Sequence, residues 1–159
     1  MQTFLPYESF FKSAEVLDNK RLGKQRVEVL QILKALYFSN YGWQNHPIVK
    51  MWKGYERLLC IYGITICCEW KHRGFVDNVA PEILKLYGDN LRKEFSGFPP
   101  WLGKKQFHLS HQSNLLHKYP EHYSKHFKNV PNNLPYKWWN PESKTFYTKE
   151  NKKSLINKK

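Results

Sequence analysis

The stretch DNKRLGKQRVEVLQILKALYF, residues 18–38, decides the fold. Its apolar positions recur at helical spacing and form one stripe: Leu22, Val29, Leu33 and Leu36. Asp18 stands directly before this periodic run, where a carboxylate caps the start of a helix. The stretch therefore predicts an amphipathic helix that packs its apolar stripe into a core.

The same helix carries a polar face of mixed chemistry. Offsets of three, four and seven return to one side of a helix, and four polar side chains share that side: Arg21, Lys24, Gln25 and Glu28. Arg26 lies beside the apolar stripe, and we expect its guanidinium at the edge of the core. Cations near one carboxylate keep it ionised and also bind phosphate. The face is therefore either a phosphate-binding site around Glu28 or a solvated surface with intrahelical ion pairs.

A second long helix is predicted further along the chain. It begins at His46-Pro47, with proline in the first helical position, and runs to Arg73. Two glycines interrupt its apolar periodicity, Gly54 and Gly63. Each of them either weakens the helix locally or marks close packing against another backbone.

The C-terminal half is expected to be less regular. Residues 81–95 predict a weaker helix broken near Gly88, and residues 104–118 predict another, followed by a short one after Pro120. From Asn129 on, prolines and asparagines indicate irregular coil that aromatic side chains dock onto the body.

These patterns predict an all-α fold class. We expect a compact, single-domain helical fold with a long central helix and an irregular, aromatic and basic C-terminal segment. The predicted domain spans 1–142, and a basic, flexible tail spans 143–159. We find no internal repeat and no strand-rich region.

The charge of the chain indicates a polyanionic partner. The 159 residues fit one domain, and 26 Lys and Arg against 13 Asp and Glu give a formal net charge of +13. Self-repulsion on this scale disfavours a compact state, so we expect a nucleic acid to bind. No run approaches the ~18 apolar residues that would span a bilayer, and the sequence MQTFLPYESFF lacks the features of a signal peptide. We expect a cytoplasmic monomer that binds nucleic acid and has no membrane partner.

Histidines gather in the helix predicted over 104–118 and just after it. His108 and His111, three residues apart, could share a metal ion, but apart from Glu121 no acidic or cysteine partner stands at ligand spacing. Phosphate contact or general acid work by one histidine is a second interpretation. The third is that these histidines are buried and hydrogen-bonded, or simply lie on the surface.

Three stretches in order resemble one known family. They are Leu17 through Glu28, where an Arg precedes a Glu; the segment from Asn45-His46-Pro47 through Arg73-Gly74-Phe75; and the segment from His111 through Tyr123. On these stretches the chain resembles the pyrimidine-dimer DNA glycosylases of the phage endonuclease V type and their bacterial relatives. The resemblance implies a compact all-helical fold, a double-stranded DNA substrate, no cofactor, and combined glycosylase and AP-lyase activity.

In that family the N-terminal amine attacks the sugar and forms a Schiff base. Carried over to this chain, the catalytic residues are Met1, through its α-amine, and Glu28, the carboxylate that stabilises the cationic sugar. Gln2 is too large to favour removal of Met1, and Val27 separates Arg26 from Glu28 where the family places such a pair side by side. The expected DNA-binding residues are Arg21, Lys24, Gln25, Arg26, His46, Arg73, His108 and His111.

Two other functions stay open at the level of sequence. One is a DNA- or RNA-binding module on the same fold without catalysis. The other is a nuclease that depends on the histidine cluster. The lesion or modified base, the choice between DNA and RNA, and the cellular or viral source are not specified by the sequence.

Overall fold

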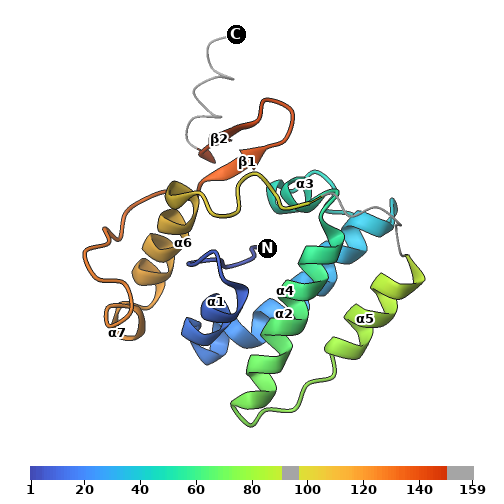
Figure 1. Ribbon diagram of the computed structural model, residues 1–159, viewed down its shortest axis with the longest axis horizontal. Helices are drawn as coiled ribbons and strands as arrows, with labels where there is room; N and C mark the ends of the chain where they lie inside the picture. The colour runs from blue at the N-terminus through green and yellow to red at the C-terminus, as the bar shows by residue number, and fades with distance from the viewer. Residues whose placement is uncertain (91–96, 150–159) are drawn as a thin grey trace.

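A computed structural model describes residues 1–90 and 97–149 of the chain (Figure 1). In these residues, helices are followed by one short antiparallel hairpin: α1 (Phe10–Val16), α2 (Asn19–Tyr37), α3 (Pro47–Trp52), α4 (Glu56–His72), α5 (Ala80–Asp89), α6 (Lys105–Lys118), α7 (Pro120–Tyr123), β1 (Trp138–Asn140) and β2 (Thr145–Tyr147). The predicted all-α class is confirmed. None of the described helices has the length and apolar character needed to cross a bilayer.

The helices α2 and α4 pack side by side at the centre of the core, and α1 and α5 pack against them. Gly63 of α4 lies where the two helices meet. A Cβ atom at this position would stand 2.6 Å from Cγ1 of Val29 on α2 and 3.0 Å from Cδ1 of Ile83 on α5. Of the two interpretations of Gly63, close packing against a neighbouring helix is therefore the correct one.

The helix predicted over residues 47–73 is in fact two helices. The chain leaves α3 at Lys53 and passes through Gly54, whose φ of +89° belongs to the left-handed region that glycine adopts without strain. A carboxylate oxygen of Glu56 accepts a hydrogen bond from the Gly54 amide at 3.1 Å and holds the turn. The break lets α3 turn away from α4 and pack against β1.

Arg73, directly after α4, binds the end of α1. Its guanidinium donates hydrogen bonds of 2.7 to 3.2 Å to three backbone carbonyls, those of Ala14, Glu15 and Leu17. It also pairs with Glu69 one turn earlier on α4, at 2.8 Å. Arg73 therefore satisfies carbonyl groups that a helix end leaves without partners.

Asp18 holds the predicted position immediately before α2, but its side chain does not cap the helix. The carboxylate instead accepts hydrogen bonds from Arg21 and from the hydroxyl of Tyr123, which follows α6 by a few residues. This contact ties the start of α2 to the C-terminal half of the chain.

The first six residues run through the middle of the molecule, between α6 and the pair formed by α2 and α4 (Figure 1). The backbone of Leu5 is held by two histidines of α6: its amide donates to Nδ1 of His111 at 3.0 Å, and its carbonyl lies 2.8 Å from Nδ1 of His108. Gln112 donates to the carbonyl of Pro6 at 2.8 Å. The N-terminal segment is thus a buried part of the fold.

The segment predicted as irregular coil contains a hairpin, and that prediction was wrong for residues 138–147. Trp138 pairs with Tyr147 and Trp139 with Phe146. The side chain of Asn140 accepts hydrogen bonds from two amides of the turn, at 2.9 and 3.3 Å. The predicted boundary between 142 and 143 falls inside this turn, and residues 150–159 of the expected tail lie outside the described residues.

The remaining helices agree with the sequence in outline. The weak helix predicted over 81–95 corresponds to α5, which ends at Asp89, one residue after the Gly88 near which the break was predicted. Residues 91–96 are outside the described part of the chain. The helix predicted over 104–118 is α6, and the short helix after Pro120 is α7.

Candidate active site

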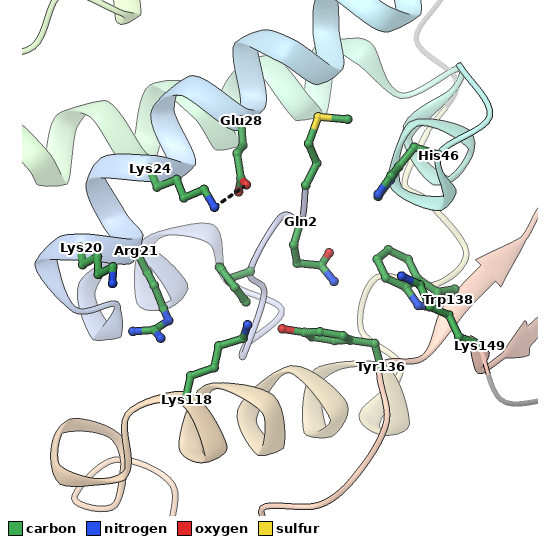
Figure 2. A pocket seen from close by; sticks show the side chains of 12 residues that line it. Gln2, Lys20, Arg21, Lys24, Glu28, His46, Lys118, Tyr136, Trp138 and Lys149 are labelled. Carbon is green, nitrogen blue, oxygen red and sulfur yellow. Dashed lines mark ion pairs between the residues drawn. The ribbon is translucent and has the colours of Figure 1, made fainter. Parts of the chain in front are cut away.

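A cavity of about 320 Å³ opens where the N-terminal segment meets α2, α3, α6 and β1 (Figure 2). One wall comes from the polar face of α2, and the opposite wall comes from the end of α6 and the segment that leads into β1. The cavity is lined by Met1, Gln2, Phe4, Lys20, Arg21, Lys24, Glu28, His46, Lys118, Tyr136, Trp138 and Lys149.

The amide side chain of Gln25 fixes the N-terminal segment against α2. Its Nε2 donates to the carbonyl of Gln2 at 2.6 Å and to the carboxylate of Glu28 at 2.7 Å. Its Oε1 accepts from the amide of Phe4 at 2.8 Å and from the hydroxyl of Tyr62 at 2.6 Å. Every donor and acceptor of this buried amide is used, so the first residues and Glu28 are held as one unit.

Among the described residues that line the cavity, positive charges surround one carboxylate. Lys20, Arg21, Lys24, Lys118 and Lys149 line it together with the first residue, and Glu28 is the acid among the lining residues. Nζ of Lys24 lies 3.6 Å from Glu28. Burial lowers the pKa of Lys118, and the neighbouring Arg21 and Lys24 lower it further. This excess of cations is the environment that a phosphate group prefers.

His46 lines the cavity as a neutral imidazole. Its Nδ1 accepts a hydrogen bond from the amide of Ile48 at 3.1 Å and caps the start of α3. Burial lowers the pKa of His46 to about 4, and the positive charges of the N-terminus and of Lys149 contribute to the shift. The ring stands edge-on to Trp138, with the two ring centroids 6.1 Å apart.

Tyr136 brings an unused hydroxyl to the same cavity. Figure 2 shows it entering with Lys118 from the side opposite Glu28. The hydroxyl is buried, and no atom of the described residues forms a hydrogen bond with it. Burial raises the pKa of Tyr136, so the group is a neutral donor. A buried hydroxyl without a partner is costly, and a bound substrate would supply one.

A family model described as pyrimidine dimer DNA glycosylase matches residues 1–94, which is more than half of the chain. This chain belongs to the pyrimidine dimer DNA glycosylase family. The resemblance drawn from the sequence is thereby confirmed, and the family implies a DNA substrate. No curated protein and no solved structure matches the chain.

The family match covers only one wall of the cavity. It includes the N-terminal segment, α2 with Glu28, and His46 at the start of α3. Lys118, Tyr136 and Trp138 lie beyond residue 94 and so belong to a part of this glycosylase-family chain that the match does not cover. The site is therefore completed by the chain's own C-terminal half.

The structure separates the residues that were predicted as a site into two groups. Met1, Glu28, Arg21, Lys24 and His46 line the cavity together. Gln25 does not line the cavity but binds both Gln2 and Glu28, which do. The other four predicted residues lie elsewhere: Arg26, Arg73, His108 and His111.

Arg26 faces away from the cavity, which corrects its expected role beside Glu28. Its guanidinium forms an ion pair with Asp77 at 2.6 Å, and that carboxylate is almost completely buried. The guanidinium also lies 4.6 Å from the ring centroid of Trp70. Because residues 26 and 28 are about 200° apart around a helix, the two side chains point to opposite sides of α2. Arg73, which binds the end of α1, is likewise a structural residue.

His108 and His111 are buried, and the fold uses both ring nitrogens of His108 and Nδ1 of His111. His108 contacts the Leu5 carbonyl and accepts from the amide of Gly103 at 2.9 Å. Burial, with a smaller contribution from the neighbouring His108, lowers the pKa of His111 to about 3. Within residues 1–90 and 97–149, no group of three or more His, Cys, Asp or Glu side chains could hold a metal ion. The interpretation of these histidines as buried and hydrogen-bonded is the correct one.

Several lining residues were not predicted from the sequence. Lys118 stands in the third stretch that resembles the family, and Trp138 stands in the aromatic segment, so each had a weak signal. Nothing in the sequence marks Tyr136. Its contribution depends on the path of the chain between α7 and β1, which has no periodic pattern.

Proposed function

We propose that this chain is a DNA glycosylase with associated AP-lyase activity, acting on pyrimidine dimers or other modified pyrimidines, and that the α-amine of Met1 is its nucleophile. One observation carries the proposal: Met1 and Glu28 line the same cationic cavity, and Gln25 binds both the N-terminal segment and Glu28. A free amine, an acid and a phosphate-binding surface are the groups that this chemistry needs.

In the proposed reaction, the neutral amine of Met1 attacks C1′ of the damaged nucleotide. The bond between C1′ and the base breaks, and the base leaves with the bonding electrons and takes up a proton. Loss of a proton from the nitrogen and opening of the sugar give the Schiff base. Removal of a proton from C2′ then expels the 3′ phosphate and cuts the strand. Glu28 stabilises the cationic sugar and is placed to accept a proton.

The cavity suits a nucleotide that has left the duplex. Enzymes that act on a base extrude it from the stack, and damaged pairs open at lower cost. Lys20, Arg21 and Lys24 along α2 would hold the phosphates on one side. Tyr136 on the opposite side would donate its hydrogen bond to an acceptor of the nucleotide.

Borohydride trapping tests the proposal directly. The protein is incubated in chelator with ultraviolet-irradiated or undamaged duplex, borohydride is added, and the adduct is digested and mapped by mass spectrometry. We expect a covalent adduct on the damaged duplex only, attached to Met1. Mapping is essential because four lysines also bring amines to the cavity: Lys20, Lys24, Lys118 and Lys149. An adduct on one of these lysines would overturn the role of Met1, and binding without any adduct would favour a non-catalytic DNA-binding module.

Replacement of the acid tests the second half of the mechanism. Glu28→Gln should lower the rate of strand cleavage by about 10²- to 10³-fold, because a charge that stabilises the cationic sugar is lost. Binding of damaged duplex should change little. The matched control is Glu82→Gln on the exposed first turn of α5, which should leave both quantities unchanged. Wild-type turnover in Glu28→Gln would remove Glu28 from the mechanism.

A further inference from the structure

A second basic hollow lies on the other side of the hairpin. It has a volume of about 470 Å³, and three lysines border it: Lys104, Lys137 and Lys144. Trp139 and Phe146, partners across the hairpin, also line it; their ring centroids are 5.0 Å apart at an angle of 71°. Among residues 1–90 and 97–149, no acidic residue lines this outer hollow.

The outer hollow and the active-site cavity share strand β1. Successive side chains of a strand point to opposite faces. Trp138 accordingly lines the active-site cavity, and the next residue, Trp139, lines the outer hollow. The two hollows therefore lie on opposite faces of β1, and an extended ligand that leaves the cavity over this strand would meet the outer hollow.

The chemistry of the outer hollow fits a phosphodiester backbone. None of its three lysines forms an ion pair with an acid of the described residues. Trp139 and Phe146 are partly exposed between them and offer apolar surface to a sugar or a base face. Cations around an aromatic floor are typical of surfaces that bind nucleic acid without reading its sequence.

We propose that the outer hollow binds the DNA backbone that flanks the reacting nucleotide, so that the substrate crosses the hairpin from the active-site cavity to the outer hollow. The inference rests on the proposed function in one respect, namely that the reacting nucleotide enters the cavity. Each DNA strand carries one phosphate for every ~3.4 Å of the duplex axis. The contact therefore involves a few base pairs on one side of the lesion, and the footprint of the protein is asymmetric.

The salt dependence of binding tests this contact without any need for turnover. Each phosphate contact contributes about 0.9 to the slope of log K against log salt concentration. The test is a triple variant of the outer hollow: Lys104→Gln, Lys137→Gln and Lys144→Gln. On a long damaged duplex, the magnitude of its slope should be smaller than that of the wild type by about 2 to 3. The control triple variant Lys12→Gln, Lys71→Gln and Lys85→Gln removes the same charge from exposed positions on α1, α4 and α5, away from the hairpin. It should leave the slope nearly unchanged.

Shortened duplexes test the position of the contact. Two duplexes of equal length carry the lesion near one end or near the other. The wild-type protein should bind one of these two duplexes several-fold more tightly than the other. The triple variant of the outer hollow, called the hairpin variant below, should bind both duplexes equally. An unchanged slope in the hairpin variant, or an equal loss in both triple variants, would overturn the proposal. Because these readouts measure binding, a failure of the Schiff-base chemistry would appear separately, as the absence of a trapped adduct.

Discussion

The side chains of Gln25 and Glu28 lie one helical turn apart on α2 and are joined by a hydrogen bond of 2.7 Å. The same amide nitrogen of Gln25 binds the carbonyl of Gln2. A single residue therefore sets the distance between the start of the chain and the acid at position 28. The positions of the proposed nucleophile and of its charge partner depend on one another.

Replacement of this amide should affect both stability and activity. Gln25→Leu leaves the buried amide of Phe4 without its acceptor and the carbonyl of Gln2 without its donor, and an unsatisfied buried group costs about 1–3 kcal/mol. We expect the free energy of unfolding, measured in urea, to fall by about 2–4 kcal/mol. The yield of trapped adduct should fall even under conditions in which the variant is folded. Gln31→Leu on the same helix is the control, and a normal adduct yield in Gln25→Leu would contradict the role assigned to this amide.

Tyr136→Phe should weaken the binding of damaged duplex without lowering the stability of the protein. The hydroxyl has no partner in the described part of the protein, so its removal should leave the free energy of unfolding unchanged or raise it by up to about 1 kcal/mol. Binding of damaged duplex should weaken about 5- to 10-fold, because the substrate loses a hydrogen bond of about 1 kcal/mol.

Tyr123→Phe is the matched comparison for that prediction. The hydroxyl of Tyr123 binds Asp18, so its loss should destabilise the fold by about 1–2 kcal/mol. Affinity for DNA should stay close to that of the wild type. If the two variants behaved alike in urea unfolding and in binding, the hydroxyl of Tyr136 would have no role in the site.

The sequence predicted the parts of the site whose residues recur at helical spacing. Glu28, Arg21 and Lys24 share one face of α2 because helical geometry requires it, and this prediction needs no tertiary information. Gly54 was ambiguous, because a glycine in an apolar helical pattern is compatible with a continuous helix or with a turn. The structure resolves the ambiguity through a positive φ that the pattern does not encode.

Other parts of the site depend on contacts between distant segments. The role of His111 follows from its bond to the amide of Leu5, more than one hundred residues earlier, and no local pattern indicates such a pair. The hairpin was missed for a similar reason. Its strands have three residues each, too few for an alternating pattern to show.

Arg26 should behave as a structural residue. Arg26→Met leaves the buried carboxylate of Asp77 without its cation, and the loss of one partner from a buried ion pair costs several kcal/mol. We expect a loss of about 2–4 kcal/mol in the free energy of unfolding and no change in the salt dependence of DNA binding. Arg21→Met, in the cavity, should lower the salt slope by about 1. A lower slope in Arg26→Met would return this residue to the DNA-binding surface.

Stability should fall as the solution becomes acidic. The pKa of His111 is about 3 and that of His46 about 4 in the folded protein, both below the ordinary value of about 6.5. At a pH between the folded and unfolded pKa values, the histidine takes up a proton in the unfolded chain but not in the folded one. The stability that each histidine contributes is therefore complete above about pH 6.5. It decreases by up to ~1.4 kcal/mol for each pH unit as the pH falls toward 3.

His111→Asn tests the assignment of this acid sensitivity. An asparagine oxygen can accept the hydrogen bond of the Leu5 amide, and it does not titrate. The variant should show a shallower dependence of unfolding free energy on pH between about 3 and 6.5. His72→Asn, at an exposed position at the end of α4, should keep the wild-type dependence. An unaltered slope in His111→Asn would show that other groups cause the acid sensitivity.

The hydrogen bonds from α6 to the backbone of residues 5 and 6 have a consequence for the folding of the chain during its synthesis. The opening residues leave the ribosome first, yet the groups that hold them, on His108, His111 and Gln112, are translated more than one hundred residues later. Until then residues 5 and 6 lack these partners, whereas Gln25 and Tyr62, which hold residues 2 and 4, have already been translated. The backbone of residues 5 and 6 is therefore fixed on this side only after α6 has been made, and a nascent chain that stalls before α6 would carry the α2 wall of the cavity without the opposite wall.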